Sequence, residues 1–501
     1  MHLASFMFKN SLLNANKKTK NDFLDSLKDV ILKIIEEEAL LLDFKDMEYF
    51  DNKALYQFNI PTKSKAHRVS YCIVLQTIRI IGLLHDVGHL PFSHQIEYAL
   101  KKVYHKILEK EINKEALLKK ELEFKIKYEE ITENSQEVLH EAIGKNLLTL
   151  LFDYEVEDLL KKTVDKEYIK LIKKLCLLIL EEKVYNGFDF KVLHNYIDST
   201  VDADRLDYVN RDMLASGYIT GPSDHIRITK QTVLVEQNSL FYLSFFDMSL
   251  IDIEHMLEMR FNLYKKVIYN HGIAKTDALL ENVVLYLSNN YFNDKIKSAN
   301  NEDNISMLWN YNEDKDVEKQ LDTISMLDEN WLISLFKKEY FYIKDKKVLT
   351  AQDKKYLYCF EDVLFGKRRF NSHWKNLNEF YKELGFQTVQ RYKFRESFGY
   401  ITENRAKTLQ KELDAFIKKW ENEKEELFFT YQIVSFKIGV QKDFCLYDGE
   451  TLINLDEIST LRKRLKHSML NTVPFYIYSN KKNLSEAMKK ELKEIILKIF
   501  S

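Results

Sequence analysis

The segment LLHDVGHLPFSHQIE, residues 83–97, concentrates residue types that can bind a metal ion and move protons. It contains three of the chain's 13 histidines within ten residues, which core packing does not require. His85 and Asp86 follow a nearly all-apolar stretch, residues 73–84, that predicts a buried helix. Burying an imidazole beside a carboxylate costs free energy unless both have a partner, and a divalent metal ion is an effective one. The pair therefore predicts a metal site, the alternative being ordinary polar residues at a helix end.

The two histidines that follow the pair have a spacing suited to catalysis. His89 comes four residues after His85 and shares its face if the helix continues through Gly88. Glu97 comes three residues after His94, where its carboxylate can hold the imidazole in one tautomer. We therefore expect His94, held by Glu97, to act as a general acid or base near neutral pH.

A second segment, IDSTVDADRLDYVNRDMLASGY, places acids and a phenol at helical spacing. Asp204, Tyr208 and Asp212 fall at positions i, i+4 and i+8, on one stripe of a helix. Such polar residues pack poorly in a hydrophobic core but suit the wall of a binding site. In such a site Asp204 would complete the metal coordination shell, and Tyr208 and Asp212 would contact a sugar. The alternative is a solvated acidic face that pairs with the neighbouring arginines.

The rest of the chain predicts a mainly α-helical protein that positions these residues. Only 12 glycines and 4 prolines occur among 501 residues, and long runs of Leu, Ile, Lys and Glu carry apolar positions at helical intervals. We expect a helical core over 1–300 with a charged, solvent-exposed helical insertion at about 101–137, and a helical extension over 301–429. Near Thr430 the residue composition changes to short runs of β-branched and aromatic residues, with a turn signal at Asp448-Gly449. This change predicts a small α/β lobe over 430–501.

Composition excludes several classes of protein. Hydrophobic residues make up 45% and charged residues 30%, and 75 basic residues nearly cancel 77 acidic ones. This composition is typical of a globular protein. The near-neutral net charge gives no overall electrostatic potential that would attract nucleic acid or a membrane surface. The four cysteines form no CxxC pair, the longest apolar run (175–180) is flanked by charges, and the N-terminus lacks the order of a signal peptide. We predict a cytoplasmic protein without a membrane span.

Together the two polar segments resemble the HD superfamily and, within it, the deoxynucleoside triphosphate triphosphohydrolases. The match consists of HDxGHxPFSH at 85–94 followed by DxDRxDYxxRD at 202–212. In that family a first histidine, a His-Asp pair and a later aspartate hold the metal ion. The resemblance implies that the last three are His85, Asp86 and Asp204. Ligands of these types suit manganese, iron, zinc or magnesium, and the sequence does not choose among them.

The same resemblance implies roles for four further residues around the phosphates. The family's phosphate-facing and catalytic histidines correspond to His89 and His94, with Glu97 in place of the usual acid behind the latter. A downstream His-Glu pair, whose histidine also faces the phosphates, corresponds to His140 and its neighbour.

The substrate contacts come from two other stretches. Arg205 corresponds to a basic phosphate contact, and Tyr208 and Asp212 correspond to residues that pack on and hydrogen-bond the deoxyribose. RFNLYKKVIYNH resembles the family's RxxxYRxVYxH helix with one extra residue. Tyr264 and Tyr269 are therefore candidate wall residues.

The resemblance implies a reaction, a substrate and partners. A metal ion would polarise a phosphoryl oxygen and lower the pKa of a water, so that attack at the α-phosphorus releases a nucleoside and intact triphosphate from a dNTP. Family members assemble into symmetric oligomers, often with nucleotide at the interfaces, so we expect a homo-oligomer and a nucleotide activator. Two alternatives stay open: another HD phosphoesterase (nucleotidase, phosphodiesterase or nuclease), or a catalytically impaired regulator that binds nucleotide or nucleic acid.

The pattern breaks at the N-terminus. The family's first metal histidine lies in a stretch reading Arg-x-x-His-Ser-x-Gly-x-x-His-Leu-Ala, and MHLAS resembles only its tail. On this alignment the metal histidine lies upstream of Met1, and His2 is the later, non-ligand histidine. The alternative is that His67 supplies the fourth ligand. We favour the first interpretation because nothing around His67 resembles the beginning of the motif.

Overall fold

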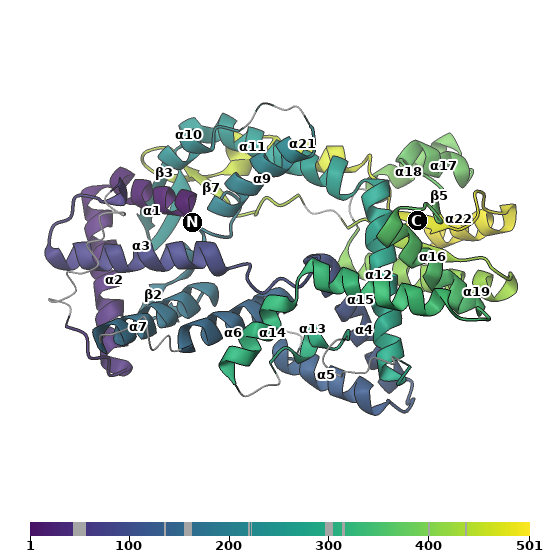
Figure 1. The fold of residues 1–501 in the computed structure, drawn as a ribbon. Coiled ribbons are helices and arrows are strands. Elements are labelled where there is room, and N and C mark those ends of the chain that lie inside the picture. Colours follow the sequence, from purple (N-terminus) through teal and green to yellow (C-terminus); the bar gives the residue numbers. More distant parts are fainter. Residues whose placement is uncertain are drawn as a thin grey trace. The chain divides into compact units, whose positions relative to one another are not determined.

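The computed structural model describes residues 1–43, 57–134, 137–154, 163–218, 221, 223–295, 304–312, 316–398, 401–435 and 438–500 (Figure 1). The predicted mainly α-helical fold is confirmed, because helices dominate and the strands of the described chain form sheets of only two or three members. The predicted boundary near residue 300 lies outside the described residues. Of the described helices, none combines the length and the apolar character that crossing a membrane requires.

The chain forms two compact units, each assembled from separate stretches of sequence. Unit 1 comprises Met1–Gly88, Ile143–Leu263 and Gly439–Arg462, and unit 2 comprises His89–Ala142, Tyr264–Ile438 and Lys463–Ser501. Two helices, α6 (Leu139–Asp153) and α21 (Leu461–Met469), have residues in both units. The segments of the two units therefore alternate along the sequence. The three consecutive domains inferred from composition stay a prediction.

The described part of unit 1 is a helical body with three small antiparallel hairpins. Its longer helices are α1 (His2–Asn14), α2 (Lys17–Glu37), α3 (Lys65–Leu84), α7 (Thr163–Leu180), α9 (Ala203–Ala215) and α11 (Leu250–Leu263). Its short elements are β1 (Val184–Tyr185), β2 (Phe188–Asp189), α8 (Lys191–His194), α10 (His225–Lys230), β3 (Thr232–Gln237), β4 (Leu240–Phe245), the 3-10 turn η3 (Asp247–Ser249), β7 (Cys445–Tyr447), β8 (Leu452–Asn454) and α20 (Leu455–Ile458). Helix α3 packs against α1, α2 and α7, while α9 packs against α1 and α11.

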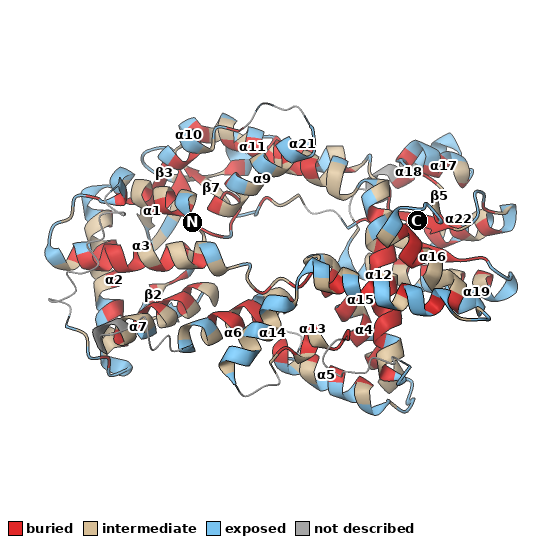
Figure 2. Ribbon diagram, viewed as in Figure 1, coloured by how far each residue is buried: buried red, intermediate tan, exposed pale blue. Residues whose placement is uncertain are grey.

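The buried stretch predicted at 73–84 is the C-terminal part of α3. Ser64 caps the N-terminus of α3, and its hydroxyl accepts a hydrogen bond from the His67 amide at 3.1 Å. Nearly every residue from Val69 to Ile78 is buried, as the red of α3 shows in Figure 2. Helix α9 begins in a similar way, because the buried Asp202 carboxylate accepts from the Arg205 amide at 2.7 Å. The Asp202 cap places Asp204 in the first turn of α9.

Unit 2 is built around the buried helix α12 (His271–Phe292). The other elements are α4 (His94–Ile112), α5 (Lys119–Ile131), the π-helical turn η4 (Tyr264–Ile268), α13 (Met307–Asn310), α14 (Val317–Met326), α15 (Glu329–Lys344), α16 (Ala351–Phe365), β5 (Asn371–Ser372), α17 (Leu377–Glu383), α18 (Thr388–Phe398), α19 (Glu403–Glu423), β6 (Phe429–Ile433), β9 (Phe475–Ser479) and α22 (Glu486–Phe500). Helices α4 and α16 and strand β6 all pack on α12. Strand β9 lies between β5 and β6, antiparallel to both.

The helices at 101–137 differ from the solvent-exposed insertion that their charge predicted. Helix α4 buries Leu100, Val103 and Ile107, and α5 buries Phe124 and Tyr128. Both helices pack on α12 and on each other. These buried apolar residues make the segment part of the core of unit 2.

The C-terminal strands form the small α/β part of the fold, as predicted. Asp448-Gly449 lies in the turn between β7 and β8, where the Asp448 carboxylate accepts hydrogen bonds from two backbone amides at 2.7 Å and Gly449 has a φ of 104°. The segment divides between the units, because β7 contacts β4 of unit 1 whereas β6 and β9 belong to unit 2.

Candidate functional site

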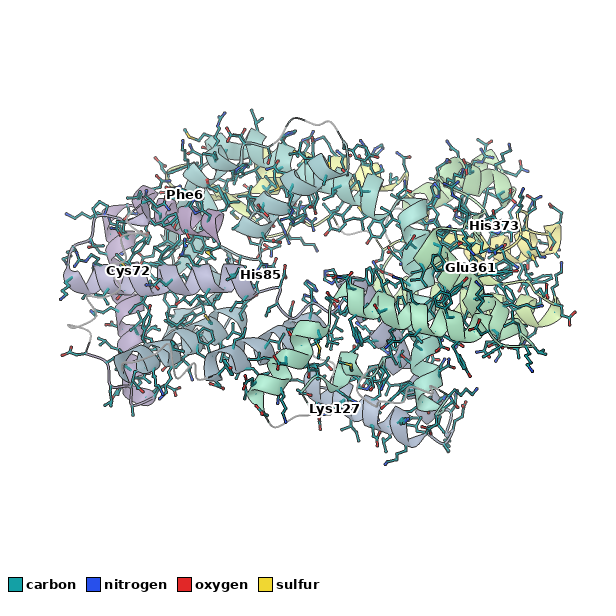
Figure 3. All side chains as sticks on the ribbon, viewed as in Figure 1. Phe6, Cys72, His85, Lys127, Glu361 and His373 are labelled. Atoms are coloured by element: carbon teal, nitrogen blue, oxygen red, sulfur yellow. The ribbon has the colours of Figure 1, made fainter. Side chains whose placement is uncertain are left out.

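His85, Asp86 and Asp204 come together in unit 1. One ligand atom from each lies within 4.8 Å of the others, and His85 Nε2 is 3.3 Å from an Asp86 carboxylate oxygen. His85 caps the C-terminus of α3, where Figure 3 labels it, and Asp204 lies in the first turn of α9. The packing of the two helices into one body thus joins residues more than a hundred positions apart in sequence.

The electrostatics of this group favour a cation. Burial raises the pKa of Asp204, and repulsion from Asp86 and Asp207 adds to the shift, against the opposing effect of His85. His85 Nδ1 is buried and has no hydrogen-bond partner among the described residues. Two carboxylates that repel each other and an imidazole nitrogen without a hydrogen-bond partner fit the coordination of a divalent metal ion. Such an ion would bind all three groups. Each of the candidate ions manganese, iron, zinc and magnesium accepts such donors.

Neither His67 nor His2 belongs to this group. His67 is in the first turn of α3, 18 residues before His85, or about 27 Å along the helix axis. Its Nε2 atom is 3.0 Å from an Asp25 carboxylate oxygen. The proposal that His67 completes the shell is therefore wrong. His2 packs edge-on against the rings of Phe6 and Phe58, with centroids 5.1 and 5.3 Å away.

A cavity of about 230 Å³ adjoins the group within unit 1. Its lining includes His85 and Asp204 together with Met1, His2 and Asp207. Asp207 is one turn beyond Asp204 on α9, and the sequence interpretation assigned it no role.

The predicted stripe of α9 exists. Asp204, Tyr208 and Asp212 are all half-buried on this helix. The Tyr208 hydroxyl accepts a hydrogen bond from Arg260 Nε at 2.9 Å, and Asp212 accepts one from Arg211 Nε at 3.2 Å. The neighbouring arginine therefore does pair with the stripe, as the alternative interpretation expected.

Arg205 is held mainly by its own helix cap. Its guanidinium lies 3.4 Å from Asp202 and 3.3 Å from Asp198, and it donates to the Gly439 carbonyl at 3.4 Å. Asp202 is fully buried, and burial raises its pKa to about 7 although Arg205 acts in the opposite direction. Sequence reasoning missed Asp202, whose signal was its position as the cap of α9.

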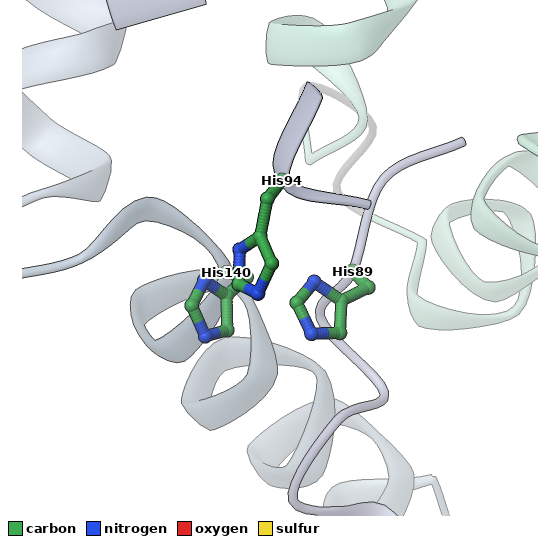
Figure 4. A group of neighbouring side chains, drawn as sticks. All are labelled: His89, His94 and His140. Atoms are coloured by element: carbon green, nitrogen blue, oxygen red, sulfur yellow. The ribbon is translucent and has the colours of Figure 1, made fainter. Parts of the chain in front are cut away.

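His89, His94 and His140 form a second cluster, in unit 2 (Figure 4). The His89 and His140 rings stack with centroids 4.3 Å apart, and the His94 ring lies edge-on to them at 4.8 and 5.0 Å. One nitrogen of each lies within 4.8 Å of the others. The three come from a loop, from the start of α4 and from the start of α6 (Figure 4).

Glu97 joins two members of this cluster. One carboxylate oxygen is 2.9 Å from His140 Nδ1 and 3.2 Å from His94 Nδ1, and the other accepts the Leu139 amide at 3.1 Å. Burial alone would raise the pKa of Glu97, but the bonds from the two histidines outweigh it and lower the pKa to about 2. The sequence paired Glu97 with His94 only, because its bond to His140 spans 43 residues.

The backbone between the two groups is not helical, which corrects one expectation. Helix α3 ends at Leu84 and residues 85–88 form turns, so His89 does not continue the face of His85. Just before α4, Phe92 and Ser93 both adopt left-handed φ angles of 58° and 53°. The Ser93 hydroxyl lies 3.1 Å from His89 Nδ1, a contact that sequence reasoning also missed.

Tyr264 and Tyr269 belong to unit 2, in and just after the π-helical turn that follows α11. Their rings are 6.5 Å apart, and the Tyr269 amide bonds the Tyr264 carbonyl five residues back at 2.8 Å. A π turn is how a helix accommodates one additional residue. The π turn lies within the stretch RFNLYKKVIYNH.

The sequence model of a known family matches the segment that carries most of these residues. The family is described as HD domain, and the match covers residues 73–176. Residues 73–176 therefore match an HD domain. The HD domain contains His85, Asp86, the three histidines of the cluster and Glu97, whereas Asp204 follows it along the chain.

Comparisons with individual proteins give weaker similarities. An uncharacterized protein of Mycoplasma pneumoniae is 26% identical over 365 residues, 70% of this chain and 71% of that protein. A protein of Acanthamoeba polyphaga mimivirus named as HD domain-containing is 24% identical over 49% of this chain and 42% of its own length. Among solved structures, a phosphohydrolase from Bacteroides thetaiotaomicron has a TM-score of 0.49 with 16% identity, covering 93% of this chain and 86% of its own.

The HD domain supports a metal-dependent phosphohydrolase in general terms. None of the names reported for these relatives specifies a nucleotide substrate.

Proposed function

We propose that this protein is a metal-dependent phosphohydrolase that converts deoxynucleoside triphosphates to deoxynucleosides and triphosphate. The observation that carries the proposal is the convergence of His85, Asp86 and Asp204, whose ligand atoms lie within 4.8 Å of one another beside a buried, unpartnered imidazole nitrogen. These three residues would hold the ion. When bound, a divalent ion polarises a phosphoryl oxygen and lowers the pKa of an attacking water.

His94 is our candidate for the residue that moves the proton. Its Nδ1 and the Nδ1 of His140 both face the Glu97 carboxylate, which favours a proton on each Nδ1 and leaves each Nε2 to exchange one. The His94 side chain is 52% exposed and that of His140 only 16%, so His94 is the more accessible of the two. His89 and His140 then contact phosphate oxygens.

Residues of α9 are proposed to orient the substrate. Arg205 contacts a phosphate and the stripe of Tyr208 and Asp212 contacts the deoxyribose, as the family resemblance implies. Tyr264 and Tyr269 are proposed to form part of the wall. Support for the stripe comes from the half-buried position of both its members on one face of the helix that carries Asp204.

We also propose that the protein is a homo-oligomer with nucleotide as activator. This rests on the resemblance alone. It is independent of the chemistry proposed for the two groups of residues.

Product analysis tests the proposed reaction. The purified protein is incubated with each of the four dNTPs and with manganese, iron, zinc or magnesium, and inorganic triphosphate is separated from pyrophosphate and orthophosphate. Release of triphosphate and nucleoside in equal amounts is the expected result. Orthophosphate or pyrophosphate instead would indicate another phosphoesterase, and nucleotide binding without any product would indicate a regulator.

A further inference from the structure

Unit 2 contains a cavity of about 590 Å³ along the C-terminal half of α4. Helices α12, α16 and α19 and strand β6 supply its other walls. The size is that of a pocket for a small molecule. The lining is polar and charged, and Lys102, Lys106 and Lys110 form a stripe along it at positions i, i+4 and i+8 of α4.

Most charges of this cavity already have partners. Lys102 pairs with Glu281 of α12 and lies 5.2 Å from the centre of the Tyr431 ring. Lys355 of α16 bonds both carboxylate oxygens of Glu421, at 2.7 and 2.9 Å.

Two further charged residues of the lining also have partners, Asp414 of α19 and Lys110 at the end of the lysine stripe. The Asp414 carboxylate accepts the Tyr431 hydroxyl at 2.8 Å. Lys110 bonds Glu121 at 2.6 Å. A ligand therefore meets a cavity in which these groups are already fixed.

Among the three lysines of the stripe, Lys106 is the exception. Its ammonium makes no hydrogen bond and no ion pair with any residue in the described part of the chain. The side chain stays exposed to solvent in the cavity although protein atoms surround it closely. Burial, with repulsion from Lys102 and Lys355, lowers the pKa of Lys106 against the attraction of Asp414 and Glu281.

We propose that Lys106 anchors a binding site for a small ligand that carries one oxyanion group, a phosphate or a carboxylate. An anion at this point would give the ammonium the direct ion-pair partner that none of the described residues provides. The five lysines and five acids of the lining balance formally, so a ligand with several negative charges is not favoured. Side-chain amides of Asn282 and Asn289 offer neutral hydrogen bonds to the rest of the ligand.

This site is separate from the histidine cluster. Lys106 lies 12 residues beyond His94 on the same helix, about 18 Å along its axis. The inference therefore does not rest on the proposed phosphohydrolase reaction, and either can fail without the other.

The test compares Lys106→Met with Lys101→Met. Lys101 is an exposed lysine of the same helix that does not line the cavity. Thermal unfolding is followed while inorganic phosphate, acetate or chloride is titrated at constant ionic strength. Phosphate or acetate is expected to raise the Tm of the wild-type protein and of Lys101→Met, because a ligand that binds only the folded state stabilises it. The increase should be absent in Lys106→Met, whose Tm without anion should equal or exceed that of the wild type.

A second measurement uses the unmodified protein. Lysine acetylation by an amine-reactive reagent is read residue by residue, and the anion should protect Lys106 in a saturable way but leave Lys101 unprotected. The better protector, phosphate or acetate, identifies the class of ligand. Equal effects of chloride, equal protection of both lysines, or an unchanged phosphate response in Lys106→Met would overturn the proposal.

Discussion

The Glu97 carboxylate accepts hydrogen bonds from the rings of His94 and His140 and also from the Leu139 amide. The folded-state pKa of about 2 lies below the ordinary value of 4.5. A depressed carboxyl pKa adds stability above pH 4.5 that is lost as the pH falls toward 2. The shift corresponds to roughly 3 kcal/mol.

We predict that Glu97→Gln lowers the free energy of unfolding at neutral pH and that its deficit against the wild type shrinks as the pH falls from 4.5 to 2. Denaturant unfolding across this range measures the deficit. Glu109→Gln, at an exposed position of the same helix, should show no such pH dependence. A deficit that stays constant with pH would mean that the carboxylate charge is not what stabilises the cluster.

His94 is expected to contribute through proton transfer alone. His94→Ala should lower turnover by roughly 10²–10⁴-fold, the usual contribution of a general acid or base. The ion proposed at His85, Asp86 and Asp204 should be retained, because His94 is not part of that group. Rate measurement and elemental analysis on the same preparation separate the two effects. An unchanged rate would assign the proton to another residue such as His140.

At the scale of elements, the loop before α4 is the strained connection that sets where His94 begins its helix. Ser93 has φ 53° and ψ −130°, a region that glycine tolerates and other residues rarely adopt. Ser93→Gly and Ser93→Ala both remove the hydroxyl that faces His89, but only the glycine relieves the backbone. We predict that Ser93→Gly is more stable than Ser93→Ala by about 1–3 kcal/mol in urea unfolding. Equal stability would show that the backbone here is not strained in solution.

The elements differ in how far their sequence predicted them. Local periodicity was sufficient for two elements. Apolar spacing predicted the C-terminal part of α3, and the i, i+4 and i+8 spacing of two acids and a phenol predicted the stripe on α9. The end of α3 at Leu84 was not predictable in this way, since residues 85–93 combine short-range turns with left-handed backbone. The π turn at Tyr264–Ile268 was not predictable from the sequence either.

Contacts between distant segments were the least predictable part of the candidate site. The His-Asp pair and Asp204 were grouped from residue types and from family resemblance, and the structure brings them together. The bond from His140 to Glu97 and the pairing of His67 with Asp25 depend on how helices pack, which no local pattern encodes.

At the scale of the whole molecule, each unit uses segments from both halves of the chain. The two clusters of candidate site residues belong to different units. The candidate metal ligands lie in unit 1 and the histidine cluster lies in unit 2. Sequential boundaries read from composition could not anticipate this interleaving, because it depends on which distant segments pack together.

The proposed assembly is the prediction that concerns the molecule as a whole. Light scattering at working concentration is expected to give a mass above that of one 59.8 kDa chain, with a further increase when dNTP is added. The physical reason is that a nucleotide held at an interface stabilises the assembly by mass action. A single-chain mass both with and without dNTP would contradict the assembly and leave the proposed chemistry untouched.

The most direct test of the central claim is the metal content and triphosphate release of Asp204→Ala beside the wild type. Asp207→Ala serves as the matched control, because this carboxylate lies one turn away on α9 and outside the ligand group. We predict that Asp204→Ala folds, retains no stoichiometric divalent ion and releases no triphosphate from dNTPs, whereas Asp207→Ala keeps its metal. Wild-type metal content and turnover in Asp204→Ala would contradict the assignment of His85, Asp86 and Asp204 as the metal centre.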